Sequence, residues 1–248
     1  MRGLEGRVAV VTGAAGGMGA AAAIRLGEER VKVALLDIKD CSETLDTITA
    51  SGGESQAWNC DTTNEAQLAQ TMKSVVEQFG GINILVNNAG ILSPRIPFMD
   101  WKTEDVERFM YVNYMGYVNT TRAAYNYIKE GGNGRIINVA SRTTFAGAPG
   151  QFPYTASKGA IQGFTWTLAK EAGVDDISVN AVMPGQVATP GTMPHSDEEA
   201  FNRTMQNQAI KKRVYPEHMA ALVAFIASDD AAMISGQSIV CDGGGLLR

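Results

Sequence analysis

A tyrosine and a lysine four residues apart could carry out acid–base chemistry. Tyr154 and Lys158 stand in the stretch FPYTASKGA, which contains no His, Cys, Asp or Glu. Residues at positions i and i+4 share one face of a helix, so the lysine cation can favour the phenolate form of the tyrosine. The pair could equally be a half-buried aromatic and a surface lysine on a core helix. The two residues alone do not decide between these interpretations.

A glycine-rich turn stands between a short apolar run and an alanine-rich segment of helix length. The stretch VVTGAAGGMGAAAAI places glycines at Gly13, Gly16, Gly17 and Gly19. Glycine permits a tight turn and lets the backbone approach a pyrophosphate, whose charge meets the helix N-terminus. With a strand before it and a helix after it, the turn predicts a dinucleotide site. A turn that is rich in glycine for packing alone is the weaker interpretation.

Two aspartates follow predicted strands. Asp37 lies about twenty residues beyond the glycine turn, where a carboxylate can accept hydrogen bonds from the adenosine ribose and would repel a 2′-phosphate. This position favours NAD over NADP, although a polar strand-end residue would look the same. Asp61, in NCDTT, could accept from the adenine amino group or cap a helix over Asn64–Phe79. We give these two interpretations equal weight.

Short, continuous apolar runs alternate with segments of helix length. The predicted strands lie within Arg7–Gly13, Val31–Ile38, Ile82–Gly90, Gly134–Ser141, Ile177–Gly185 and Gln237–Gly244, with a further one before Asp61. The predicted helices are Met18–Glu29, Asn64–Phe79, Thr103–Glu130, Phe152–Gly173 and Pro216–Ser228. Continuous runs are typical of strands buried on both faces. The alternation predicts an α/β fold, a Rossmann-like doubly wound parallel sheet of about seven strands. Helices should cover both faces, in one domain over residues 1–248.

One segment breaks the alternation. Gln186–Ile210 contains Pro190, Gly191 and Pro194 and several polar residues. It follows the C-terminal end of a strand, where ligands bind in such sheets. We therefore expect a lid over the site rather than a surface helix with loops.

Composition excludes several classes of protein. The 248 residues carry a net charge of −5, which argues against nucleic acid as the main partner. No apolar run is long enough to cross a membrane, and the N-terminal residues contain no signal-peptide cleavage site. The cysteines, Cys41, Cys60 and Cys241, lie far apart. No clustered metal ligands are visible, so no metal is expected, and the cysteine pattern indicates a reducing, cytoplasmic compartment.

Taken together, these features resemble the short-chain dehydrogenase/reductase family over nearly the whole chain. The matching motifs are TGAAGGMG at Thr12–Gly19, Asp37, Asp61, NNAG at Asn87–Gly90, Asn113, Ser141, YTASK at Tyr154–Lys158, and Pro184–Gly185 with Thr189. Each motif is weak alone, but their order and intervals make chance agreement very improbable. The resemblance implies hydride transfer between NAD(H) and a secondary alcohol, ketone or related small carbonyl compound.

The resemblance also implies a catalytic group of four residues: Asn113, Ser141, Tyr154 and Lys158. Tyr154 would be the general acid/base, which requires its pKa to fall well below about 10. Lys158 would supply the charge that lowers this pKa and would bind the nicotinamide ribose. Ser141 would hold the substrate oxygen, and Asn113 would position a water that relays protons to Lys158.

Further contacts are implied by the same resemblance. The residues expected at the cofactor are Gly13, Gly16, Gly17, Met18, Gly19, Asp37, Ile38, Asp61, Thr62, Asn88, Ala89, Gly90, Tyr154, Lys158, Pro184, Gly185, Val187 and Thr189. Those expected at the small-molecule substrate are Ser141, Thr143, Phe145, Phe152, Tyr154, Gln186 and Met193. Their side chains favour an apolar pocket, and TTFAGAPG resembles family members that act on small ring-bearing alcohols. Arg95 or Arg142 could receive an anionic group, or could simply be exposed.

Assembly and alternative functions complete the predictions. Related proteins pair the helices at 103–130 and 152–173 across subunits, so we expect a homotetramer; tight packing within one subunit is the alternative. A non-catalytic dinucleotide-sensing or scaffold protein on the same fold remains the alternative function. A methyltransferase needs no Tyr–Lys pair, and a serine hydrolase would need the absent G-x-S-x-G.

Arg30 departs from the family pattern, which usually has a glycine there as a helix C-cap. A left-handed conformation would cost an arginine free energy. We therefore expect this turn to be built differently, for instance with Gly27.

Overall fold

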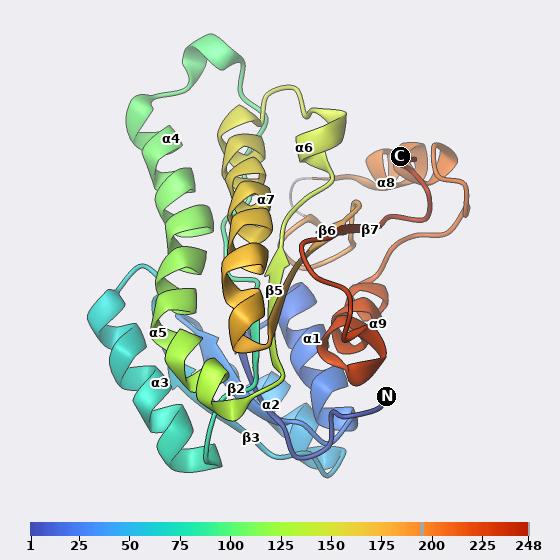
Figure 1. Ribbon diagram of the computed structural model, residues 1–248. Coiled ribbons are helices and arrows are strands. Elements are labelled where there is room, and N and C mark those ends of the chain that lie inside the picture. Colours follow the sequence, from blue (N-terminus) through green and yellow to red (C-terminus); the bar gives the residue numbers. More distant parts are fainter. Residues whose placement is uncertain (194–195, 248) are drawn as a thin grey trace.

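The protein is built around a seven-stranded parallel sheet, seen in the computed structural model, which describes residues 1–193 and 196–247 (Figure 1). The strands are β1 (Val8–Thr12), β2 (Lys32–Asp37), β3 (Ser55–Asn59), β4 (Ile84–Asn87), β5 (Gly134–Val139), β6 (Ile177–Pro184) and β7 (Ser238–Cys241). Their spatial order is β3-β2-β1-β4-β5-β6-β7, and each neighbouring pair is parallel. The predicted fold is confirmed. The order reverses between β1 and β4, where ligands bind at the C-terminal strand ends.

Helices cover both faces of the sheet. They are α1 (Gly17–Glu28), α2 (Ser42–Ala50), α3 (Glu65–Phe79), α4 (Thr103–Met110), α5 (Gly116–Gly131), α6 (Thr143–Ala146), α7 (Phe152–Ala172), α8 (Glu198–Gln206) and α9 (Pro216–Ala227). Figure 1 shows α3, α5 and α7 on one side of the sheet and α1, α2 and α9 on the other. Of the helices in the described residues, none is long and apolar enough to cross a membrane.

Side chains of β1 alternate between the two larger apolar clusters of the protein. Val10 of β1 lies in one core with Met72 of α3, and Val11 lies in the other with Leu26 of α1 and Val223 of α9. All five residues of β1 are buried. A strand covered on both faces needs apolar residues at every position, which explains the continuous runs in the sequence.

The helix predicted over Thr103–Glu130 is interrupted by a π-helical turn at Tyr111–Met115. In Figure 1, α4 and α5 nevertheless form one continuous rod. A π turn adds a residue to the helical repeat, so the side chains beyond it face a new direction. Asn113 lies inside this turn and is fully buried.

The turn after α1 corrects our prediction. Arg30 does adopt a left-handed backbone, with φ 65°. Its Nη1 donates to the carbonyl oxygen of Gly52 at 2.6 Å, which offsets part of the strain. Gly27 serves another purpose: a Cβ there would lie 2.8 Å from Ile48 Cγ2. The glycine lets α1 pack closely against α2.

The segment predicted as a lid leaves β6 and contains α8. Phe201 of α8 is buried, and the Arg213 guanidinium lies 4.7 Å from its ring centre. The last lid residue, Ile210, donates its backbone N–H to Gly243 O at 2.8 Å. Pro194 and His195 of this segment, and Arg248, lie outside the described residues.

Candidate active site

The glycine-rich turn places a helix N-terminus at the C-terminal end of β1. Gly16 is the N-cap of α1, and no side chain caps this helix. The first N–H groups of α1 are therefore available to an anion. Gly13 and Gly17 have φ values of 69° and 58°, which favour glycine. A Cβ at Gly19 would lie 2.1 Å from Gly13 O, so the turn and the helix touch backbone to backbone.

Asp37 ends β2 beside this turn. Its Oδ2 accepts from the Ala15 N–H at 3.0 Å, and its Oδ1 accepts from the Lys39 N–H at 2.9 Å. These two bonds fix the carboxylate next to the helix N-terminus. The neighbouring Ile38 side chain is 64% exposed, which offers an apolar surface to a flat ring.

Asp61 lies exposed at the C-terminal end of β3. Its Oδ1 accepts from the backbone N–H and the hydroxyl of Thr63. The N-cap of α3 is instead Asn64, whose side chain accepts from the Gln67 N–H. The interpretation of Asp61 as a helix cap is wrong. Thr62, which follows Asp61, is buried.

The NNAG segment joins the ends of β1 and β4. Asn88 Nδ2 donates to Thr12 O at 3.0 Å and to Gly13 O at 3.2 Å, and the Ala89 N–H donates to the Thr12 hydroxyl at 3.1 Å. A Cβ at Gly90 would lie 2.9 Å from Asn113 Oδ1 and 3.8 Å from Lys158 Nζ. The absence of a side chain at Gly90 therefore leaves room beside the lysine.

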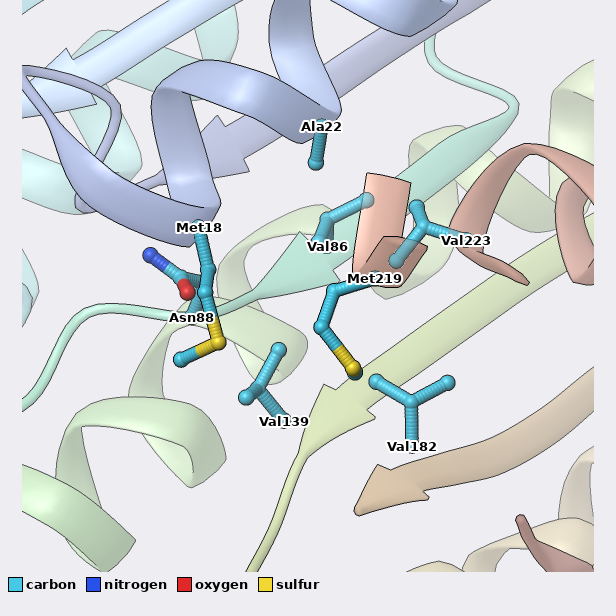
Figure 2. Close-up of a pocket in the computed structure, with 8 residues that line it drawn as sticks. All are labelled: Met18, Ala22, Val86, Asn88, Val139, Val182, Met219 and Val223. Carbon is cyan, nitrogen blue, oxygen red and sulfur yellow. The ribbon is translucent and has the colours of Figure 1, made fainter. Parts of the chain in front are cut away.

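A small apolar pocket lies under the glycine turn (Figure 2). Met18 of α1 and Met219 of α9 extend their side chains into it. The other lining residues are Ala22, Val86, Asn88, Val139, Val182 and Val223. The pocket has room for about one water molecule. The Met18 side chain lines this pocket, and the residue is partly exposed.

Lys158 is buried, and 5% of its surface is exposed. Its Nζ donates to Val139 O at 2.8 Å and to the Tyr117 hydroxyl at 3.3 Å. It also lies 5.9 Å from the ring centre of Tyr154. Burial lowers the pKa of Lys158 to about 7. The interpretation of Lys158 as an exposed surface lysine is wrong.

Tyr154 is partly exposed beside this lysine. Burial raises its pKa above the ordinary value, and a hydrogen bond with Ser141 opposes the rise. The chain alone therefore does not lower the pKa of Tyr154, contrary to the prediction, because lost solvation outweighs the hydrogen bond. The side chain is a neutral phenol at neutral pH, the form that donates a proton.

Ser141, at the end of β5, has its hydroxyl oriented by a neighbour. Its Oγ accepts from the Thr143 N–H at 3.3 Å and from the Thr143 hydroxyl at 3.0 Å. A hydroxyl with both acceptor positions used can still donate its own proton. Next to it, Arg142 Nη1 donates to the buried Asp242 carboxylate at 2.9 Å. This ion pair occupies the arginine, so Arg142 is a poor receptor for an anionic group.

The Asn113 side chain connects three segments. Its Oδ1 accepts from the Ile91 N–H at 2.7 Å. Its Nδ2 donates to Ile91 O and to Ser157 Oγ, both at 3.1 Å. Both amide protons are thus engaged, and one lone pair of Oδ1 remains for a water molecule. The side chain makes no direct hydrogen bond to Lys158.

Two aromatic residues predicted at the substrate lie in packed clusters. The Phe152 ring centre lies 5.1 Å from that of Phe98 and 6.2 Å from that of Trp101. Phe145 packs against the core cluster that contains Tyr117 and Met183. Phe152 therefore belongs to an aromatic group at the start of α7, and Phe145 packs against the apolar cluster that includes Ala140, the residue before Ser141.

The beginning of the predicted lid closes on the glycine turn. A Cβ at Gly17 would lie 3.5 Å from Thr189 Cβ, and Thr189 is buried. The Gln186 side chain accepts a hydrogen bond from Thr204 of α8. Met193 is 53% exposed. The contact of Thr189 with Gly17 places the start of this segment beside the glycine turn.

The residues around the junction of β6 and the segment predicted as a lid have mainly packing contacts. Pro184 ends β6, and a Cβ at Gly185 would lie 2.7 Å from Asp242 Cβ. Val187 is buried and forms an isolated parallel bridge with Val214. The backbone of this connection lies at the same edge of the sheet as Ser141.

Sequence reasoning missed Tyr117, which lies beside Lys158. It stands four positions after Asn113, but a tyrosine at this spacing looks like an ordinary core residue. Its contact with Lys158 depends on how α5 and α7 pack, which no single-sequence pattern reveals.

The chain also matches known proteins along almost its whole length. Residues 13–245 match the family model described as enoyl-(acyl carrier protein) reductase. The chain is 36% identical to the 3-oxoacyl-(acyl-carrier-protein) reductase FabG of Thermotoga maritima, over 97% of this chain and 98% of that protein. A short-chain dehydrogenase from Mycobacterium paratuberculosis bound to NAD superposes with a TM-score of 0.90 at 31% identity, over 98% of each chain.

A second solved structure has the same fold at lower sequence identity. Carveol dehydrogenase from Mycobacterium avium in complex with NAD superposes with a TM-score of 0.94 at 25% identity, over the whole of both chains. The chain therefore belongs to the short-chain dehydrogenase/reductase family and is an oxidoreductase of that family.

Proposed function

We propose that the protein transfers a hydride between NAD(H) and a secondary alcohol or ketone, with Tyr154 as the general acid/base. The observation that carries this proposal is the position of the buried Lys158 beside Tyr154 and Gly90, at the same strand ends as the uncapped N-terminus of α1. The uncapped N–H groups fit a pyrophosphate, and the fixed Asp37 carboxylate fits ribose hydroxyls. A bound nicotinamide supplies the hydride chemistry.

In ketone reduction, the neutral Tyr154 phenol gives its proton to the substrate oxygen as that oxygen gains charge. Ser141 donates a second hydrogen bond to the same oxygen, because Thr143 occupies its acceptor positions. The Lys158 ammonium stabilises the phenolate that remains. In alcohol oxidation the same groups act in reverse, with the phenolate accepting the proton.

We propose NAD rather than NADP as the preferred cofactor. Asp37 supports this choice, since its two backbone hydrogen bonds hold a carboxylate where a 2′-phosphate would otherwise lie. Like charges brought together without a counterion are costly. Two structural relatives were solved with NAD.

We propose a small, uncharged, ring-bearing alcohol or ketone as the substrate, enclosed by a lid at Gln186–Ile210. Apolar side chains are exposed in the loop after β4 and on the lid: Leu92 at 41%, Phe98 at 70% and Met193 at 53%. Arg142 is already paired with Asp242, which disfavours an anionic substrate. One relative, carveol dehydrogenase, is named for an alcohol.

The test is a turnover screen with NAD and a panel of cyclic alcohols, and with NADH and the matching ketones, followed by the absorbance of the reduced nicotinamide. We expect turnover with some members and a loss in kcat of at least ~10²-fold in Tyr154→Phe. NADH binding without turnover across the panel would favour the dinucleotide-sensing alternative. Near-normal turnover in Tyr154→Phe would refute the role of the tyrosine.

We also propose a homotetramer that uses the outer faces of α5 and α7. These helices form a solvent-facing groove lined by Tyr114, Val118, Thr121, Arg122, Tyr125, Asn126, Phe164 and Leu168. Light scattering should give four times the mass of the chain, and Leu168→Glu should lower it because a charge in an apolar interface is costly. Ala50→Glu, on exposed α2, is the control. A monomeric wild-type protein would refute the proposal.

A further inference from the structure

We propose that Tyr117 is a positioning residue that holds the Lys158 ammonium in place for the reaction. This inference rests on the proposed function, because it concerns the lysine that serves Tyr154. Tyr117 is outside the four residues that the family resemblance implies. It comes from α5, whereas Lys158 belongs to α7.

Three polar atoms form a closed triangle under the site. Lys158 Nζ lies 2.8 Å from Val139 O and 3.3 Å from the Tyr117 hydroxyl, and that hydroxyl donates to Val139 O at 3.1 Å. The exposed fraction of Tyr117 is 1%. Water therefore does not compete for these hydrogen bonds.

The number of hydrogen-bond donors on each group determines how Lys158 and Tyr117 can interact. An ammonium group has three N–H donors, and a phenol has one O–H donor and can also accept. Tyr117 donates its proton to Val139 O, so it meets Lys158 as an acceptor. The fold thus engages two of the three Lys158 donors. The third remains for the ribose, the Tyr154 oxygen or a water molecule.

The two phenol rings also flank the charge. Lys158 Nζ lies 5.1 Å from the ring centre of Tyr117 and 5.9 Å from that of Tyr154. A cation near an aromatic face gains electrostatic stabilisation, which is larger when the site is desolvated. Tyr117 therefore acts on the ammonium through both its hydroxyl and its ring.

The π turn brings this contact about. Asn113 lies inside the turn and bonds to Ser157 of α7, and Tyr117 lies one helical turn later and bonds to Lys158. Successive turns of one helix thus hold neighbouring residues of the other. The same packing that fixes the Asn113 side chain also fixes the phenol that meets the ammonium.

The charge balance gives the expected direction of the effect. Among the described residues, the titratable groups that face Lys158 are the phenols of Tyr117 on α5 and Tyr154 on α7; β5 contributes the uncharged carbonyl of Val139. Burial, and then the nearby Tyr154, raise the pKa of Tyr117 well above its usual range, so it stays a neutral acceptor. Removing that acceptor disfavours the charged lysine and lowers its pKa further.

The first test needs no substrate. The protein is labelled with [ε-¹³C]lysine, and the Lys158 signal, assigned with Lys158→Gln, is titrated by NMR in wild type and Tyr117→Phe. We expect the Lys158 pKa to fall by about one unit, the size of one hydrogen bond to a charged group. Tyr127→Phe makes the same change further along α5 and should leave the Lys158 pKa unchanged. An equal Lys158 pKa in Tyr117→Phe and wild type would overturn the inference.

The second test follows kcat for ketone reduction against pH. Reduction needs Tyr154 protonated and Lys158 charged, so we expect Tyr117→Phe to move the alkaline loss of activity to lower pH by about one unit. A uniform fall in kcat without this movement would show a packing role only and would overturn the inference. Tyr117→Met, which removes ring and hydroxyl together, provides the same test if Tyr117→Phe does not fold.

The two proposals fail in different ways. If no substrate is turned over but the NMR titration shifts, the proposed reaction fails and the role of Tyr117 in holding Lys158 stands. If Tyr154→Phe is inactive and the Tyr117→Phe titration does not shift, the reaction stands and the positioning role fails.

Discussion

The Asp37 side chain, which backbone hydrogen bonds hold in place, is the residue that we propose sets the preference for NAD over NADP. Its carboxylate is fixed by the N–H groups of Ala15 and Lys39. We expect Asp37→Ala to reduce the preference in kcat/KM for NAD over NADP by at least ~10-fold, since about 1.4 kcal/mol corresponds to a factor of ten. Asp40→Ala, on a neighbouring exposed aspartate, should leave the preference as in wild type. An unchanged ratio in Asp37→Ala would contradict the assignment.

Single residues were also where sequence reasoning succeeded and failed most clearly. The family resemblance, carried by the order of the motifs, implied that Asn113, Ser141, Tyr154 and Lys158 lie near one another. Their ionisation was not predictable, because the pKa values of Tyr154 and Lys158 depend on how completely packing removes water. The role of Tyr117 could not be predicted from the sequence either, because its partner Lys158 comes from a different helix and their contact depends on packing.

At the level of elements, strands with a continuous apolar run were easy to predict, and the edge strand β3, which lacks such a run, was harder to delimit. Strand β3 is only half-buried and lies at the sheet edge, so SQAWN lacks the apolar run seen in β1. Helix α2 buries only Thr44 and Ile48, and α6 is a single turn. Neither gives a strong helical period. The π turn at Tyr111–Met115 gave no signal, because its residues also suit an α-helix.

Arg30 allows a test of strain at the end of α1. Its backbone has φ 65°, which costs an L-residue roughly 1–2 kcal/mol. We expect Arg30→Gly to raise the free energy of unfolding by about 0.5–1 kcal/mol in urea denaturation. This net gain already subtracts the entropic cost of the glycine and the loss of one exposed hydrogen bond. Arg30→Ala keeps the strain and loses the bond to Gly52, so it should be less stable than wild type. A glycine variant no more stable than the alanine variant would contradict this account.

For the whole molecule, the buried lysine makes stability depend on pH. The pKa of Lys158 in the folded protein is about 7, below its usual 10.5. Between these two values the unfolded chain binds more protons than the folded one, so stability rises with pH; below about pH 7 the full cost of burial is present. Relative to Lys158→Met, the wild type should gain about 2 kcal/mol in free energy of unfolding from about pH 7 to about pH 9.

The measurement is urea denaturation at several pH values. The control is Lys73→Met on α3, where 63% of the lysine side chain is exposed. Its difference from wild type should stay nearly constant over the same range. Parallel stability curves for wild type and Lys158→Met would contradict the prediction.

The π turn takes up one extra residue within the helix formed by α4 and α5. Each residue turns a helix by about 100°, and the wider turn absorbs this rotation, so the flanking helices keep the phase of an uninterrupted helix that is one residue shorter. Deleting one residue of Tyr111–Met115 should therefore leave Tyr117 facing Lys158 and Thr121 facing Asn87, to which it is bonded at 3.0 Å. The change would be confined to the turn itself, where Asn113 lies. A deletion elsewhere in α5, between Gly116 and Thr121, would turn the residues beyond it by about 100° and break the contact with Asn87.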